Sequence, residues 1–498
     1  MDAVADASKH HALELHRWTD PSVLSVAAVA FAAGFGQFGV VAALGHVATA
    51  FGHLSDGVSL ADQAGLSGTT LGVGLAVIRL ASLGGLPVAS WADRLGRKRT
   101  LIGACATGLA LTAAAAASPS FWWFVAIFAI GRPALSASAA LSTVIGAEQT
   151  ASRDRAAAVA LMAASYAVGA GLTAILNSFA GSTLGFRGLC ILALVPLAVL
   201  PAVVRLVTEP DRFVQQRRDA RGERRPLPVL GAVARPYRRR LAVIALLAFS
   251  VSIVTGPANS FPFLYAQNVL HLAGAVTALM VVASGALGLF GLLAGRWLAD
   301  AIGRRPAAAL AMLGIVSSAI LAYSGSPAAL VCGYILGVTS GAVFAPGAGA
   351  LANELMPTAI RASVAGWQVA SGVLGAVCGL VAFGAIATAD NRFSVAAVLT
   401  FAPVALTVLL FLALPETRGR EPEALWPTPG EPAGGAPPAT WPGAGAPGAT
   451  EADVPGSAAV PTDGVPRVGG AGSSVDRSVG RVSTSGSGGE GGARAEGT

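Results

Sequence analysis

Apolar stretches of about 20 residues recur along the chain from Val23 to Leu414, and short polar segments separate them. A helix of about 20 apolar residues is long enough to cross a hydrocarbon core of about 30 Å. The stretches lack period-two alternation and are dominated by alanine, so they predict helices rather than strands. The pattern predicts twelve membrane-spanning helices, at 23–48, 69–92, 100–118, 120–146, 157–180, 186–207, 241–265, 273–298, 307–324, 328–352, 359–387 and 393–414.

The composition agrees with a membrane protein. Of 498 residues, 54% are hydrophobic and 12% are charged, and the mean hydropathy is +0.66. An average soluble domain carries about 25% charged residues. This argues against a soluble enzyme, a disordered hub and a secreted disulfide scaffold. The four cysteines stand alone inside apolar stretches, so the sequence indicates no metal site, no disulfide framework and no cofactor.

The positive charge is unevenly distributed over the loops. Nineteen Lys and Arg residues fall in the loops on the side of the two termini, and two fall on the other side. Such a bias places the basic loops in the cytoplasm. We therefore expect a multi-pass protein of the plasma membrane with both termini cytoplasmic. The net charge of +7 then needs no nucleic-acid partner, although the basic loop 212–240 is suited to contact anionic membrane lipids.

A loop motif occurs twice. Asp93-Arg94-Leu95-Gly96-Arg97 follows the second predicted span, and Asp300-Ala301-Ile302-Gly303-Arg304 follows the eighth, 207 residues later.

Glutamates repeat at nearly the same offset. Glu148 precedes Arg155 by seven residues, and 206 residues later Glu354 precedes Arg361 by seven. Glu209 follows the sixth span, and Glu416 follows the twelfth, 207 residues later. Three motif pairs at offsets of 206 or 207 residues predict a parallel duplication of two six-helix halves.

This duplication divides the chain into five parts. We expect a cytoplasmic segment at 1–22, a first six-helix half at 23–207, a basic cytoplasmic linker at 208–240, a second half at 241–414 and a cytoplasmic tail at 415–498. The tail is rich in Gly, Pro, Ala and Ser and has no apolar face, so most of it is predicted to be disordered.

The duplicated motifs resemble those of the major facilitator superfamily. The Asp-Arg-x-Gly-Arg-Lys loop after the second span matches the superfamily signature, while Glu354-x-x-Pro357-x-x-x-Arg361 and Pro415-Glu416-Thr417 resemble sugar-porter signatures. The resemblance covers about residues 23–425 and implies twelve helices around a central site. It implies a secondary transporter of the sugar-porter or metabolite-symporter branch, acting as a monomer.

The resemblance also implies a gate. Asp93 would dock at the start of the helix near Thr358, and Asp300 at the start of the helix near Ser152, because a carboxylate is stabilised at a helix N-terminus. Ion pairs of Glu148 with Arg155 and of Glu354 with Arg361 would lie at the same face. These contacts would favour the state closed to the cytoplasm. The alternative is that these charges only set topology and helix ends.

Two arginines lie away from the loops, the tails and the helix ends, Arg79 in the second predicted span and Arg132 in the fourth. A charge at the centre of a spanning helix costs about 2.5–3.5 kcal/mol, so such residues point to function. Counted from Asp93 and Glu148, they lie at similar depth. Two cations without a carboxylate indicate an anionic substrate, because a guanidinium binds carboxylate or phosphate with two parallel hydrogen bonds. The alternative is that one of them bonds backbone carbonyls of a neighbouring helix.

Other polar side chains in the spans extend the candidate site. In this superfamily the first, fourth, seventh and tenth helices line the cavity, which favours Gln37, Asn259 and Gln267. Arg132 matches an arginine linked to proton coupling in several members. His46 is a second candidate for a proton role, because the ordinary pKa of histidine lies near neutrality.

These observations predict a transporter of a small organic solute, anionic in character, that works by alternating access and is coupled to protons. The alternative within the class is a proton-driven exporter of drugs or secondary metabolites. More distant alternatives are a solute sensor that does not transport and a polytopic membrane enzyme. The enzyme is disfavoured because the spans hold no paired carboxylates and no nucleophile with a base.

Overall fold

The computed structural model describes residues 16–57, 59–151, 153–210, 213, 235–388, 392–420 and 425–426. Their regular structure is helical, apart from an isolated bridge between His16 and Thr150. Eleven of the described helices are long and apolar enough to cross a membrane. The predicted all-helical membrane fold is confirmed. The tail predicted to be disordered lies almost wholly outside the described residues.

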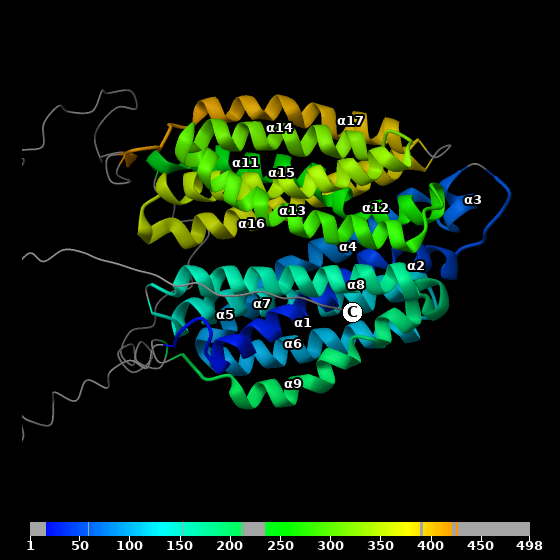
Figure 1. The fold of residues 1–498 in the computed structure, drawn as a ribbon, viewed down its shortest axis with the longest axis horizontal. Coiled ribbons are helices and arrows are strands. Elements are labelled where there is room, and N and C mark those ends of the chain that lie inside the picture. The colour runs from blue at the N-terminus through cyan, green and yellow to red at the C-terminus, as the bar shows by residue number, and fades with distance from the viewer. Residues whose placement is uncertain are drawn as a thin grey trace, which may run out of the picture. The chain divides into compact units, whose positions relative to one another are not determined.

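The first half of the chain forms one group of helices, drawn in blue to green in Figure 1. α1 packs mainly against α8 and α7, and α6 packs against α7. The group consists of α1 (Pro21–Ala42) with α2 (Leu44–Phe51), the short α3 (Leu60–Ala64), α4 (Gly68–Ala81) joined through η1 (Ser82–Gly84) to α5 (Gly85–Leu95), α6 (Arg97–Ala114) with η2 (Ala115–Ala117), α7 (Phe121–Gln149), α8 (Arg155–Ile191) and α9 (Leu194–Leu206).

The sixth span is built from two pieces. α8 is interrupted at Gly185, whose φ of 59° and ψ of −175° are not helical, so the chain turns there. The last residues of α8, from Phe186 to Ile191, continue into α9. The segment from Phe186 to Leu206 is thus about 30 Å long at 1.5 Å per residue, which is enough to cross a hydrocarbon core. With this segment the described helices make the twelve spans that the sequence predicted.

The second half forms the other group, drawn in green to orange in Figure 1. α11 packs against α16, and α15 packs against α13 and α14. The group consists of α11 (Arg235–Ser260) followed by α12 (Pro262–Leu264) and the π-helical turn η4 (Tyr265–Val269), α13 (Gly274–Ala301), α14 (Arg304–Ala322), α15 (Pro327–Glu354), α16 (Thr358–Ala387), and α17 (Phe393–Leu406) with η5 (Thr407–Ala413). Much of the predicted linker 208–240 lies outside the described residues, and α11 already begins at Arg235.

Glycines let helices within this half approach closely. A Cβ at Gly295 of α13 would lie 2.5 Å from the carbonyl oxygen of Val343 on α15. Gly375 and Gly379 of α16 face the backbone of α11 in the same way, at Phe249 and Ile253. Lipid gives helices no hydrophobic reason to associate, so close backbone packing of this kind supplies much of the contact energy.

The two halves contact each other mainly through α4 with α16 and α8 with α13. The hydroxyls of Thr69 and Thr388 lie 2.8 Å apart, and Thr277 donates to Ser178 at 2.8 Å. Near them, α2 packs against α12 and α3 packs against η4. All of these contacts lie toward the end of the bundle that carries α3. The halves are therefore joined at that end in this conformation.

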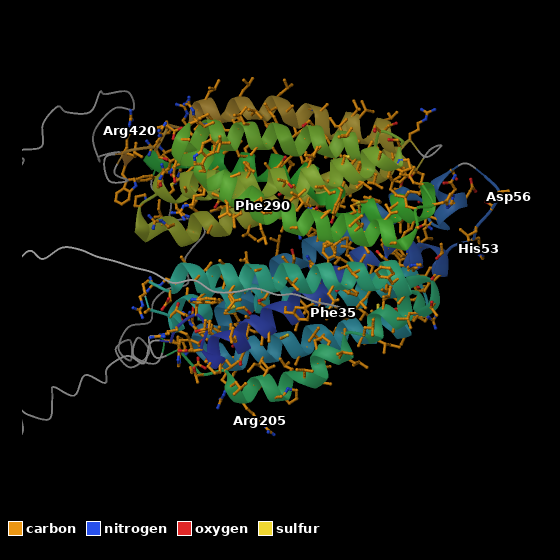
Figure 2. The ribbon with its side chains drawn as sticks, viewed as in Figure 1. Phe35, His53, Asp56, Arg205, Phe290 and Arg420 are labelled. Atoms are coloured by element: carbon orange, nitrogen blue, oxygen red, sulfur yellow. The ribbon has the colours of Figure 1, made fainter. Side chains whose placement is uncertain are left out.

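The opposite end carries the duplicated charges. Because successive spans are antiparallel, the end of α5, the start of α6, the end of α7 and the segment after α9 come together there, as do their counterparts in the second half. Figure 2 shows nitrogen and oxygen atoms gathered at this end, near Arg420, whereas carbon dominates the middle of the bundle. We call this the charged end.

In each half a glutamate caps a helix at the charged end. Glu209 accepts hydrogen bonds from the backbone N–H groups of Arg97 (2.5 Å) and Lys98 (3.0 Å) at the start of α6. Glu416 accepts from those of Arg304 (2.9 Å) and Arg305 (3.0 Å) at the start of α14. The first N–H groups of a helix lack partners within the helix and attract negative charge, so each carboxylate satisfies two of them.

The glycine of each loop motif makes this cap possible. Gly96 and Gly303 stand directly before α6 and α14 with φ of 104° and 108°. Residues with a Cβ rarely adopt such angles, which explains why the motif repeats a glycine at this position.

Ion pairs complete the charged end, but with different partners from those predicted. Arg97 pairs with Glu148, and Nε of Arg304 lies 3.0 Å from the carboxylate of Glu354. The sequence had assigned Arg155 and Arg361 to these glutamates. In this conformation the pairs differ, because α6 and α14 begin beside the ends of α7 and α15 and direct their first arginines there, and pairing with Arg155 and Arg361 stays a prediction for the state closed to the cytoplasm. Arg155 is exposed, and Arg361 donates to the carbonyl of Met356 at 3.4 Å.

The aspartates of the loop motif stay within their own half in this conformation. Asp93 lies 3.5 Å from Arg97, its side chain is 67% exposed, and Asp300 is exposed as well. Their docking on the other half thus stays a prediction for a state in which the charged ends come together. Arg94 is exposed beside Asp93.

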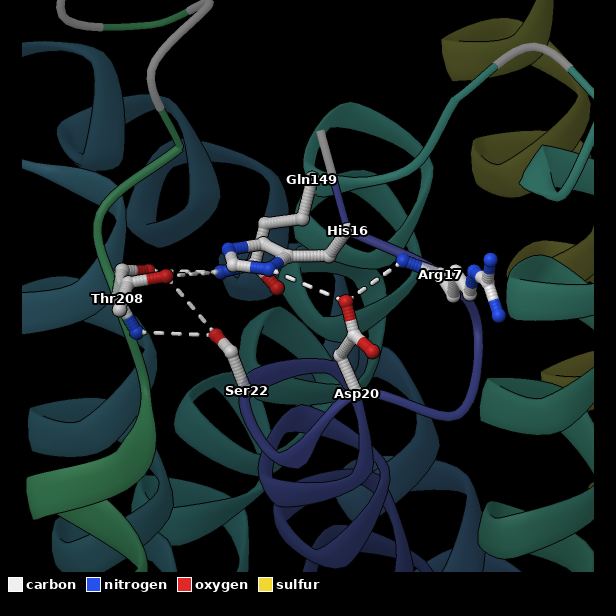
Figure 3. A network of polar contacts seen from close by, with 6 residues as sticks. All are labelled: His16, Arg17, Asp20, Ser22, Gln149 and Thr208. Atoms are coloured by element: carbon white, nitrogen blue, oxygen red, sulfur yellow. Dashed lines mark hydrogen bonds and ion pairs between the residues drawn. The ribbon is translucent and has the colours of Figure 1, made fainter. Parts of the chain in front are cut away.

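A polar network fixes the segment that carries Glu209 (Figure 3). The hydroxyl of Ser22, at the start of α1, lies 2.9 Å from that of Thr208. Gln149, at the end of α7, donates to the carbonyl of Thr208 at 2.8 Å. Asp20 accepts from the backbone of Arg17 at 2.8 Å and lies 3.4 Å from His16. The network joins α1, α7 and the segment after α9, which holds Glu209 over α6.

We predict that Glu416→Gln lowers the apparent melting temperature of the purified protein at pH 7, because a lost helix cap costs about 1 kcal/mol. Burial raises the pKa of Glu416, but four backbone N–H groups outweigh it and hold the pKa below its ordinary 4.5. The folded state therefore favours the carboxylate. Its contribution is complete above pH 4.5 and is lost as the pH falls through the lower folded pKa.

Melting curves of the wild type and the variant should therefore converge on acidification. Asp56→Asn, an exposed carboxylate at the other end of the bundle, is the control and should leave the curve unchanged. The capping role would be contradicted if the melting temperatures of wild type and Glu416→Gln differed as much well below pH 4.5 as they do at pH 7.

Candidate functional site

A cavity of about 780 Å³ lies between the two halves. Eight helices line it: α1, α4, α7 and α8 from the first half, and α11, α13, α15 and α16 from the second. The four helices expected from the resemblance are among them, as α1, α7, α11 and α15. Most of the wall is apolar, so its few polar side chains stand out as the groups that could orient a ligand.

Arg79 and Arg132 both line this cavity, as their similar depth predicted. Arg132, on α7, is only 9% exposed, whereas Arg79, on α4, is exposed to the cavity. Within the described part of the chain no carboxylate forms an ion pair with either guanidinium. The structure thus brings together two cations that the sequence placed on separate helices.

Arg132 bonds a neighbouring helix and keeps a donor free. Its Nη1 donates to the backbone carbonyl of Gln37 on α1 at 3.2 Å, which is the alternative that the sequence had left open for one arginine. Its Nε is buried and has no hydrogen-bond partner among the described residues. A buried donor without a partner costs about 1–3 kcal/mol, so a ligand that accepts from it would be stabilised.

Gln37 is held from two sides. Its backbone carbonyl accepts from Arg132, and its side-chain oxygen accepts from the hydroxyl of Tyr166 at 3.1 Å. Gln37 is 5% exposed and lines the cavity, so these bonds fix its amide with the NH₂ group as a remaining donor. Tyr166 comes from α8, and the three side chains therefore join three helices of the first half.

The second half contributes neutral polar groups. Asn259, predicted from the sequence, lines the cavity on α11. Sequence reasoning missed the lining hydroxyls, which come from Thr255, Ser260, Ser284 and Tyr334. Tyrosine inside an apolar span would have been a usable signal, because the chain has only five tyrosines. The serines and Thr255 gave no such signal, since small hydroxyls commonly bond the backbone of their own helix.

Two predicted residues lie away from the cavity. His46, on α2, packs against Gly181 of α8, where the amide oxygen of Asn177 also lies. Gln267 is on η4, with its side-chain oxygen facing Gly45 of α2. Both stand near the end of the bundle where the halves meet. For Gln267 the sequence could not show this, because α11 ends at Ser260 and the chain continues as the separate turns α12 and η4.

The site offers hydrogen-bond donors and cations rather than metal ligands. No group of three His, Cys, Asp or Glu side chains that could hold a metal is found among the described residues. What the arrangement can do is bind an anionic group at one wall and a neutral, largely apolar body against the other.

Relatives of the chain are transporters. The chain is 32% identical over 311 residues to the 3-(3-hydroxy-phenyl)propionate transporter of Escherichia coli (strain K12), which covers 58% of this chain and 70% of the relative.

Solved structures share the fold at lower identity. The xylose transporter XylE from E. coli superposes with a TM-score of 0.64 at 18% identity, over 81% of this chain and 98% of XylE. The nucleoside transporter NupG superposes with a TM-score of 0.63 at 17% identity, over 78% of this chain and 99% of NupG.

The family model of the Major Facilitator Superfamily matches residues 26–317 and 260–449. These ranges include both copies of the duplicated motifs and every helix that lines the cavity. The resemblance inferred from the motifs is thus confirmed, and the chain belongs to the Major Facilitator Superfamily of membrane transporters.

Proposed function

We propose that the chain is a secondary transporter that carries an organic carboxylate across the plasma membrane by alternating access. The observation that supports this most directly is the pair Arg79 and Arg132 in one cavity. A guanidinium matches a carboxylate in shape and can donate two parallel hydrogen bonds to it. Arg79 is free to do so from the cavity side, and the Nε of Arg132 is a donor without a partner.

The rest of the wall suits an aromatic or similarly apolar acid. Phe38, Val338 and Leu380 supply an apolar surface, while Asn259 and Tyr334 can bond a hydroxyl on the substrate. The related E. coli protein is named for 3-(3-hydroxyphenyl)propionate, which combines a carboxylate, a ring and a phenolic hydroxyl. We therefore propose a phenylalkanoate or a close analogue as the substrate class, and use this compound as the probe.

We further propose that the charged end faces the cytoplasm, with both termini there. The excess of Lys and Arg in the loops of that end supports this orientation. Since the halves are joined at the other end, the cavity would open to the cytoplasm in this conformation. The reverse state would join the charged ends and open the cavity outward.

The duplicated loop motif would act as the gate of that reverse state. Glu209 and Glu416 already cap the helices of their own half, so Asp93 and Asp300 remain available at the surface. Each would dock at a helix start on the opposite half, Asp93 at α16 and Asp300 at α8, and leave again when the cavity opens to the cytoplasm.

Proton coupling is part of the proposal, by analogy with symporters of the superfamily. The described residues that line the cavity include no Asp, Glu or His. A candidate whose ordinary pKa lies near neutrality is His46, in the span Pro21–Phe51 at the joined end of the halves. A proton on the substrate carboxyl itself is the other route. The two proton routes can be distinguished by measuring uptake into vesicles with and without an imposed pH gradient. The measurement compares wild type with His46→Gln.

We predict that Arg79→Gln and Arg132→Gln each raise the KM for 3-(3-hydroxyphenyl)propionate uptake into proteoliposomes about 10- to 100-fold. Each removes a hydrogen bond to a charged group, worth about 1.5–3 kcal/mol. Arg79→Lys should recover only part of the affinity, because lysine cannot make the two parallel bonds.

Arg205→Gln is the matched control, since it removes one exposed cation outside the cavity and should leave uptake unchanged. Wild-type protein that moves lipophilic cations but no carboxylate would overturn the proposed substrate and favour the drug exporter. The proposed substrate would also be overturned if Arg79→Gln and Arg132→Gln both kept the wild-type KM.

We predict that Asp93→Asn slows uptake while expression and probe binding stay near wild type, because the gate contact contributes about 0.3–1 kcal/mol at an exposed helix start. Turnover should fall about two- to five-fold. Asp56→Asn, at the other end, serves as control. Normal turnover in Asp93→Asn would show that the motif sets topology alone.

A further inference from the structure

We infer that the empty transporter returns slowly between its two states, so that the protein works fastest as an exchanger of one carboxylate anion for another. This inference rests on the proposed function, since it assumes that the cavity binds the substrate as its carboxylate anion, with no proton on the carboxyl group. It adds a transport mode, argued from the charge of the cavity rather than from its shape.

The formal charge of the cavity wall is fixed and comes from the first half alone. Arg79 and Arg132 contribute two positive charges, and arginine does not lose its proton in proteins. The described lining residues include no Asp or Glu that could offset them and no His or Lys that could titrate. The empty cavity therefore carries about two positive charges over the whole physiological pH range.

Internal contacts satisfy this charge only in part. Arg132 has one bond, to the carbonyl of Gln37, and the hydroxyl of Tyr166 is directed at the side-chain oxygen of Gln37 and not at a guanidinium. Arg79 is exposed, so in the present conformation water and mobile anions can reach it. Solvent, rather than the protein, stabilises much of the charge in this open state.

Alternating access requires a state in which the halves touch at both ends and the water of the cavity is reduced. Charges without partners are strongly disfavoured when water is removed, because their mutual repulsion grows and their hydration is lost. A bound carboxylate cancels one charge and accepts hydrogen bonds from the donors. The loaded protein therefore crosses the closed state more easily than the empty one does.

The consequence is a slow return after each delivery. When a carboxylate leaves on one side, the empty protein waits for another anion before it crosses again. If unlabelled carboxylate is present on the far side, the return is loaded and fast. Labelled uptake should then be accelerated by internal carboxylate.

The test measures the initial uptake of labelled 3-(3-hydroxyphenyl)propionate into proteoliposomes with three fillings: buffer alone, the unlabelled acid, and its neutral amide. Wild-type uptake should rise about tenfold or more with the acid inside, since each 1.36 kcal/mol of barrier changes a rate tenfold. The amide has the same skeleton without the charge and should give no acceleration.

Variants show whether the arginines cause the effect. The ratio of uptake with and without internal acid does not depend on the amount of protein inserted. It should fall in Arg79→Gln, whose empty cavity carries one charge fewer, and stay at the wild-type value in the control Arg205→Gln.

Equal wild-type uptake with and without internal acid would overturn the inference while leaving the proposed function standing. Acceleration by the amide as strong as by the acid would also overturn it, because charge would then not be the cause. No uptake of the acid into any vesicles would instead remove the proposed function, and this inference with it. The wild-type ratios decide the question even where a variant transports too little to measure.

Discussion

A charge inside a membrane needs compensation, and this constraint organises the molecule. Hydrocarbon offers no partner to an ionised side chain, so the chain places its charges either at helix ends or in a cavity that water can enter. At the charged end, Glu209 and Glu416 cap helices while Arg97 and Arg304 pair with Glu148 and Glu354. These charges are thus paired within their own half, so one half can move relative to the other without breaking these contacts.

Charges in the cavity need compensation as well, but there the described residues supply no carboxylate. Arg79 and Arg132 have no carboxylate partner among the described residues, and the fold leaves them facing the space between the halves. Compensation must then come from what enters the cavity. This links the architecture to the proposed substrate, since a carboxylate supplies what the wall lacks. The neutral polar groups of the second half, such as Asn259 and Tyr334, would select among carboxylates.

Much of this could be predicted from the sequence, because charge is rare in spans and the duplication repeats it at a fixed offset. The twelve helices and the similar depth of Arg79 and Arg132 followed from such patterns, while the lining positions of Gln37 and Asn259 followed from the resemblance to the superfamily. The partners of Glu148 and Glu354 did not, since they depend on which helix ends meet in space. Gln267 was grouped with the cavity because linear position cannot show that α11 breaks before η4.

The central claim is that the two arginines recognise a carboxylate, and ligand-induced stabilisation of the purified protein tests it most directly. A ligand that binds the native state raises its apparent melting temperature. 3-(3-Hydroxyphenyl)propionate should stabilise the wild type, its amide should not, and the double variant Arg79→Gln/Arg132→Gln should respond to neither. Equal stabilisation of the wild type by the acid and the amide would contradict the account, as would a double variant that still responds to the acid alone.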